Sequence, residues 1–129
     1  MYNLYLDDTR MPKDSFGYMG YFEYMTEDWV IARNFDEFVK IVKENGIPEM
    51  ISFDHDLADQ HYGVHDHLTK DEYDLYTEKT GYHCAKWFID YCIDNNFNLP
   101  KMILIHSMNT AGALNIKSLF DTYKKIYGK

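Results

Sequence analysis

Four short and mostly apolar runs are spaced along the chain, and they predict buried β-strands at residues 4–6, 29–32, 50–53 and 102–105. Apolar residues three and four positions apart predict helices over 35–45, from 81 onward, and from 110 or 111 to 127. The buried helix faces are expected at Phe35, Phe38, Val39 and Val42, then at Ala85, Phe88, Ile89 and Cys92, and finally at Ile116, Leu119, Phe120, Tyr123 and Tyr127. Strands that alternate with helices are typical of parallel β/α units, so the pattern predicts a three-layer, doubly wound α/β domain with a mostly parallel sheet.

Two segments do not follow this alternation. Residues 9–28 carry Pro12, Gly17 and Gly20 among many aromatic residues, and we expect a loop or an irregular hairpin there. Residues 57–80 are polar, with six acidic residues and two lysines, so they contribute −4 of the net charge of −8. A structureless loop of this length is uncommon in a compact domain, which predicts a flap or insertion beside the functional site.

Composition narrows the class of protein. With 129 residues, 46% hydrophobic and 26% charged, residues 1–129 are expected to form one folded domain. The net charge of −8 disfavours duplex DNA and membrane surfaces as partners, unless a metal ion or a local basic patch reverses the field. No signal peptide or membrane-spanning run is visible, and Cys84 and Cys92 are too far apart on one predicted helix to bridge. We therefore expect a cytoplasmic protein, and the sequence does not indicate its oligomeric state.

Three of the predicted strands end in residues that can do chemistry. They are Asp7 and Asp8 after the first strand, Asp54, His55 and Asp56 after the third, and His106 and Ser107 after the fourth. In open α/β sheets, ligands bind beyond the carboxyl ends of the strands, at the point where the strand order reverses. The convergence of these residues therefore predicts a site at that edge.

The carboxylates Asp7, Asp8 and Asp54 are predicted to hold a divalent cation, Mg²⁺ or Mn²⁺. Like charges held close together repel, and a hard cation with oxygen ligands neutralises them. The alternative for a single Asp is that it merely caps the turn that follows its strand.

His55 and His106 are candidates for proton transfer, because imidazole titrates near neutral pH. Asp54 and Asp56 would lie on one face about 6.6 Å apart if the strand continues, so that one can be a ligand or nucleophile and the other an acid or base. The alternatives are a turn in which Asp56 bonds its own backbone, and strand-end histidines that serve only as buried hydrogen-bonding groups.

Arg10, Ser107 and Asn109 are candidates for binding phosphate. An Arg can grip a phosphate with two N–H groups, and Ser107 and Asn109 stand where a helix begins and its backbone N–H groups attract anions. The alternative for Arg10 is a salt bridge to Asp7 or Asp8.

Three blocks of sequence resemble one known family. Leu6-Asp7-Asp8-Thr9-Arg10, Ser52-Phe53-Asp54-His55-Asp56-Leu57 and His106-Ser107-Met108-Asn109 with Gly112 are similar to the cyclic-phosphate-processing receiver domain, a family derived from the two-component receiver. The resemblance covers residue 4 to about residue 119, and it implies a receiver or flavodoxin-like fold with an acidic Mg²⁺ site. It also implies a phosphoryl-accepting position at Asp54 and a phosphate contact at Ser107. The final strand of a signalling receiver, with its lysine, is not expected after the last helix.

The resemblance implies a metal-dependent phosphohydrolase that opens a cyclic phosphate, on a nucleotide or at an RNA end. An alternative is a non-catalytic module that binds a nucleotide or a partner protein through the tyrosines of residues 16–28 and 62–82. Two further alternatives are a true phosphoacceptor at Asp54 and a haloacid-dehalogenase-like phosphatase that uses Asp54 and Asp56.

Overall fold

The computed structural model describes residues 2–57 and 79–127. The predicted flap at 57–80, with the tyrosines between 62 and 78, lies outside the described residues except at its two ends. None of the described helices is long and apolar enough to cross a bilayer.

The centre of the fold is a parallel sheet of four strands, in the order β2-β1-β3-β4. The strands are β1 (Asn3–Leu6), β2 (Val30–Ala32), β3 (Met50–Phe53) and β4 (Met102–Ile105). The order reverses between β1 and β3, because β2 lies on the far side of β1 while β4 continues beyond β3. The receiver-like α/β prediction is therefore confirmed, and the point of reversal lies between the two strands that precede Asp7 and Asp54.

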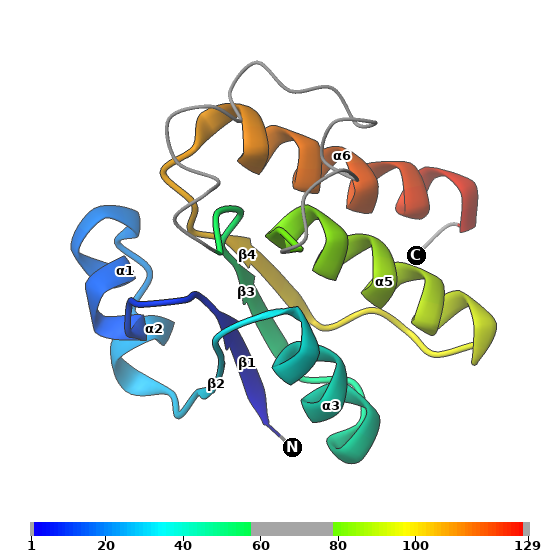
Figure 1. Ribbon diagram of the computed structural model, residues 1–129, viewed down its shortest axis with the longest axis horizontal. Coiled ribbons are helices and arrows are strands. Elements are labelled where there is room, and N and C mark those ends of the chain that lie inside the picture. The colour runs from blue at the N-terminus through cyan, green and yellow to red at the C-terminus, as the bar shows by residue number, and fades with distance from the viewer. Residues whose placement is uncertain (1, 58–78, 128–129) are drawn as a thin grey trace.

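Helices cover both faces of the sheet (Figure 1). On one face lie α3 (Phe35–Asn45), α5 (Gly81–Asp94) and α6 (Thr110–Tyr127), and on the other lie α1 (Pro12–Met19) and the short α2 (Glu23–Thr26). Asn34 caps α3, since its side chain accepts the N–H of Glu37 at 2.8 Å.

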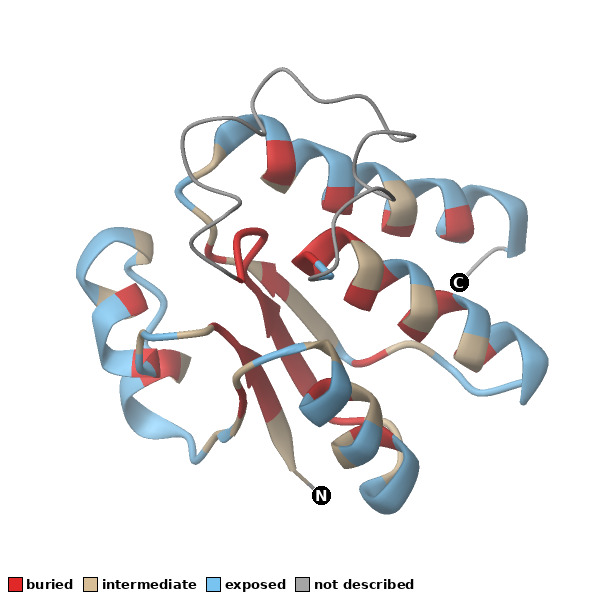
Figure 2. Ribbon diagram, in the orientation of Figure 1, coloured by how far each residue is buried: buried red, intermediate tan, exposed pale blue. Residues whose placement is uncertain are grey.

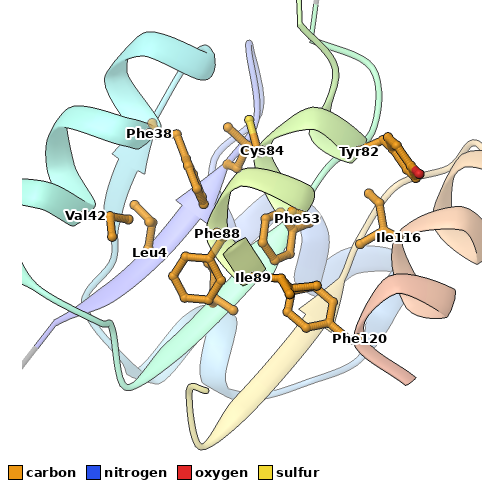
Figure 3. Packing of buried hydrophobic residues seen from close by; sticks show 14 of the residues in the cluster. Leu4, Phe38, Val42, Phe53, Tyr82, Cys84, Phe88, Ile89, Ile116 and Phe120 are labelled. Atoms are coloured by element: carbon orange, nitrogen blue, oxygen red, sulfur yellow. The ribbon is translucent and has the colours of Figure 1, made fainter. Parts of the chain in front are cut away.

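The main core lies between the sheet and α3, α5 and α6 (Figure 3). Alternate residues of the strands enter it, and the rings of Phe38, Phe53, Phe88 and Phe120 pack at its centre. Figure 2 shows the same division, because the buried residues of these helices face the sheet and the exposed ones face outward. The predicted helix faces are buried at Phe38, Val42, Ala85, Phe88, Ile89, Cys92, Ile116, Phe120 and Tyr123, whereas Tyr127 is 50% exposed.

The opposite face of the sheet is more polar. Tyr5 and Leu104 of the sheet are buried there together with Tyr24 of α2, and Trp29 packs against them. Ser52, which points to the same face as Tyr5 by register, is also fully buried. A buried hydroxyl must be hydrogen-bonded to offset the cost of leaving water, so this face needs an internal network of hydrogen bonds.

The prediction of a loop or hairpin over 9–28 is wrong, because α1 and α2 occupy much of this segment. Pro12 stands in the first turn of α1, where a missing N–H costs nothing, and the Asp14 side chain accepts the N–H of Met11 at 2.8 Å. Gly20 ends α1 with a φ of 78°. Pro12 and Gly20, interpreted as loop residues, are the first-turn and C-cap residues of a helix.

Candidate functional site

Asp7, Asp54 and His106 form a row across the carboxyl end of the sheet. Leu6 pairs with Phe53, and Phe53 with Ile105, so the next residue of each strand continues the same register. The backbone bonds extend this far, since Asp54 N–H donates to the Leu6 carbonyl at 3.0 Å and His106 N–H to the Phe53 carbonyl at 2.9 Å. All three side chains are buried, and their ligand atoms lie within 4.8 Å of one another.

Asp7 is held at both carboxylate oxygens. Its Oδ1 accepts the N–H groups of Thr9 at 3.0 Å and Arg10 at 2.8 Å, and its Oδ2 accepts Nε2–H of His106 at 3.1 Å. Burial acts to raise the pKa of Asp7, but these hydrogen bonds outweigh it and hold that pKa below its ordinary value. Asp7 therefore caps the turn after β1 as an ionised carboxylate and also points one oxygen into the row.

Asp54 has the opposite titration behaviour. Burial, with a further contribution from the charges of Asp7 and Asp56, raises the pKa of Asp54 to about 8, although the N–H of His55 donates to its Oδ1 at 2.8 Å. Two carboxyl groups this close do not readily share one buried site as two anions. A cation bound between them would remove that repulsion, so the donor set fits a divalent metal.

The His106 ring is enclosed and uses both nitrogens. Nε2 is bonded to Asp7, and Nδ1 lies 2.7 Å from Oγ of Ser52. Burial lowers the pKa of His106, against the influence of Asp7, which favours the neutral ring. Asp8, which was predicted as a metal ligand, is half-buried and is not part of the row in the described structure.

His55 lies on the other side of the sheet from His106, between the first turns of α5 and α6. Its Nδ1 donates to Oδ1 of Asp56 at 2.8 Å, and the Asn109 amide donates to the same oxygen at 3.3 Å. Gly81 and Gly112 are the residues that let the helices approach, because a Cβ on either would collide with the backbone or the ring of this segment. Asp56 thus bonds to the imidazole of His55.

The three residues predicted to bind phosphate lie around the same edge. Asn109 is the N-cap of α6, since its Oδ1 accepts the N–H of Gly112 at 2.9 Å, and its own N–H donates to Oγ of Ser107 at 3.1 Å. The Arg10 guanidinium reaches from the loop after β1 to the loop after β4, where it contacts the Met108 sulfur at 3.2 Å. It also donates to the Tyr18 hydroxyl at 3.1 Å, and its charge partly opposes the rise in the pKa of Asp54.

Sequence reasoning missed four residues that support this edge. Arg33 donates to the carbonyls of Asp7 at 3.2 Å and Arg10 at 2.8 Å, which fastens the loop after β1. The Tyr18 hydroxyl donates to the carbonyl of His106. Ser52 and Tyr24 lie behind His106 and are bonded to each other at 2.7 Å. Of these four, only Ser52 could have been noticed in the sequence, because it is a polar residue within an otherwise apolar strand.

A parallel sheet with its order reversing between β1 and β3, and with buried acids at that point, is typical of a receiver-like α/β domain. The sequence profile of the cyclic-phosphate processing receiver domain matches residues 2–122, and the chain belongs to that family. No curated protein and no solved structure matches the chain significantly.

Proposed function

We propose that this domain is a metal-dependent phosphohydrolase that opens a cyclic phosphate, either on a nucleotide or at the end of an RNA. The observation that carries the proposal is the pair of buried carboxylates Asp7 and Asp54, set side by side at the sheet reversal. The family is named for cyclic-phosphate processing, which supports the same class of substrate.

Asp7 and Asp54 are the proposed ligands of the cation, and Asp8 is a third. Mg²⁺ commonly uses one or two carboxylates together with substrate phosphate oxygens, and Mn²⁺ accepts the same ligands. When bound, such a cation polarises the phosphoryl group and neutralises charge that develops on it. Loss of the Asp54 proton would accompany binding, because its pKa is raised to about 8 in the metal-free protein.

The proposed phosphate cradle consists of Arg10, Ser107 and the first turn of α6. The Arg10 side chain spans the loops after β1 and β4, so it lies over the edge where the acids converge. The backbone N–H groups that begin α6 add a positive field at the same edge. Asn109 contributes by fixing this turn as its N-cap.

His55 and Asp56 are the proposed proton-transfer couple, and Asp56 keeps the proton of His55 on Nδ1. A water oxygen attacks phosphorus and gives its proton to Nε2 of His55, the ester bond to one ribose oxygen breaks, and that alkoxide takes the proton back. The product is a phosphomonoester, with one water added. His106, also predicted to transfer protons, is engaged at both nitrogens and is better suited to hold Asp7.

Mass spectrometry on a substrate panel tests the proposal. Purified protein is incubated with 2′,3′-cyclic mononucleotides, a cyclic-phosphate-ended RNA and cyclic dinucleotides, each with Mg²⁺, Mn²⁺ or EDTA. We expect a gain of one water on one substrate class, lost in EDTA and in Asp54→Ala. Asp94→Asn, at the other end of α5, is the matched control and should keep full turnover.

A non-catalytic binding module is the second candidate, because His55 and His106 are both fully buried. For such a module, we expect one nucleotide of the panel to bind the protein and to be recovered chemically unchanged with every cation. That result, or equal turnover by wild type and Asp54→Ala, would overturn the hydrolase.

A further inference from the structure

A chain of buried hydrogen bonds runs from α2 through β3 to the carboxylate row. The Tyr24 hydroxyl lies 2.7 Å from Oγ of Ser52, and that oxygen lies 2.7 Å from Nδ1 of His106. Nε2 of the same ring lies 3.1 Å from Oδ2 of Asp7. The four residues are between 0% and 3% exposed, so water does not compete for these bonds.

The chain has a defined direction. An ionised Asp7 can only accept, so Nε2 of His106 carries the ring proton. In the neutral ring, Nδ1 then accepts, and the hydroxyl of Ser52 must donate to it. Because the single proton of Ser52 is used in this way, Tyr24 donates to Ser52. Each group is therefore satisfied by the next, and the carboxylate terminates the chain.

Aromatic rings hold the plane of the imidazole. The Tyr5 ring stacks on the His106 ring with centroids 4.4 Å apart and planes 5° apart. The Tyr24 ring meets it edge-on, at 6.3 Å and 83°. The imidazole is thus fixed in rotation by stacking and by its bond to Ser52, and in tautomer by Asp7.

We propose that Tyr24 and Ser52 are positioning residues of the cation site, which act by fixing the orientation of the His106 ring and hence the carboxylate of Asp7. On this proposal His106 donates to a metal ligand and is not itself a ligand. The inference rests on the proposed cation site, but its first half concerns the metal-free protein alone.

A second buried tyrosine–serine pair on the same face of the sheet provides a matched control. The Tyr5 hydroxyl lies 2.7 Å from Oγ of Ser15, and both residues are fully buried. Tyr5→Phe therefore deletes a buried tyrosine–serine hydrogen bond of the same length as Tyr24→Phe does, together with a 3.2 Å bond to the Met11 carbonyl. It keeps the ring that stacks on His106 and leaves the hydrogen bonds from Tyr24 to Asp7 intact. A general packing defect would affect both variants alike.

NMR of the histidine ring nitrogens in metal-free protein is the first test. We expect His106 to carry its proton on Nε2 in wild type and in Tyr5→Phe. Ser52→Ala removes the donor to Nδ1, so we expect the Nδ1 resonance to shift to that of a nitrogen without a hydrogen bond and a second ring orientation to be populated. An imidazolium or a proton on Nδ1 in wild type, or an Nδ1 signal in Ser52→Ala that is unchanged from wild type, would overturn the proposal.

Mn²⁺ titration is the second test. Loss of an outer hydrogen-bond partner of a metal ligand lowers affinity by about 10- to 100-fold, so we expect roughly a tenfold loss in Ser52→Ala and a smaller loss in Tyr24→Phe. In a double-mutant cycle, Tyr24→Phe should add nothing once Ser52 is absent, because it acts only through Ser52. Additive losses, or an equal loss in Tyr5→Phe, would contradict the proposed chain.

The two proposals fail in different ways. Protein that binds Mn²⁺ with the expected variant pattern but hydrolyses no cyclic phosphate would overturn the proposed function and support this inference. Wild-type protein that binds no divalent cation would overturn the cation half of the inference, whatever the ring tautomer.

Discussion

Gly112 of α6 and the His55 ring are packed so closely that no side chain fits between them. A Cβ on Gly112 would lie 2.6 Å from Cδ2 and 2.7 Å from Nδ1 of that ring. Because His55 is fully buried and bonded to Asp56, it cannot move aside without breaking that bond. The close approach of α6 thus depends on a glycine.

Gly112→Ala is expected to lower the free energy of unfolding by about 1–3 kcal/mol, the usual cost of overpacking. Urea denaturation measures this loss. Gly17→Ala is the matched control, because Gly17 is exposed within α1 and a Cβ there would meet nothing within 4 Å. That variant should be neutral or more stable by about 0.5–1 kcal/mol. Equal destabilisation by the two changes would refute the packing argument.

Asp54 predicts a pH dependence of stability in protein free of divalent cation. Its folded pKa is about 8, and its unfolded pKa is about 3.9. Between these values the folded state holds a proton that the unfolded state releases, so the free energy of unfolding falls as pH rises. The stabilisation is complete below the unfolded pKa and is lost as pH rises through the folded one.

The corresponding experiment compares wild type with Asp54→Asn by urea denaturation, at intervals from about pH 5 to about pH 8. The difference in unfolding free energy should change by up to about 1.4 kcal/mol per pH unit, with the wild type losing stability toward higher pH. A difference that is constant across this range would show that Asp54 titrates normally.

Asp7 and Asp8 should differ in their importance for cation binding. Asp7 lies in the buried row, and Asp8 is half-buried outside it. We expect Asp7→Asn to weaken Mn²⁺ binding by more than the roughly 10- to 100-fold that loss of an outer partner of a ligand costs, and Asp8→Asn to weaken it less. Calorimetric titration of both variants gives the comparison. A larger loss in Asp8→Asn would make Asp8 the principal ligand.

Arg33 is expected to hold the loop after β1 through its paired bonds to the carbonyls of Asp7 and Arg10. Both of these bonds come from Nη1, while Nη2 contacts the Met11 sulfur at 3.2 Å, and the single nitrogen of a lysine cannot occupy both positions. Arg33→Lys should therefore cost roughly 1–2 kcal/mol of stability and weaken Mn²⁺ binding. Lys43→Met, on exposed α3 surface, is the control for loss of charge and should change neither property. An Mn²⁺ affinity of Arg33→Lys equal to that of the wild type would show that Arg33 does not support the site.

The order of strands and helices could be predicted from the sequence, because hydrophobic spacing reports burial directly. The same method failed at residues 9–28. There the buried residues of α1 are Pro12 and Ser15, so the helix has no apolar stripe to reveal it. Pro12 and Gly20 mark the start and the end of this helix, but the same residue types are also typical of loops, so they do not by themselves predict a helix.

The site was partly predictable for a similar reason. Asp7, Asp54 and His106 follow apolar runs, so the sequence places each at a strand end. It does not give the register between strands, and the register decides that His106 joins the row while His55 points to the other face. Nor does it indicate Arg33 or Tyr24, whose contacts join residues more than 20 positions apart.

The row also ties ligand binding to folding itself. Its members come from β1, β3 and β4, and they meet only when all three strands are in register. A one-residue slip of β3 would put Phe53 or His55 where Asp54 belongs, and every other side chain of that strand would change faces. A cation that binds the row therefore stabilises the native strand register over every shifted one. The rise in melting temperature when the cation is added then reports how fully the strands are in that register.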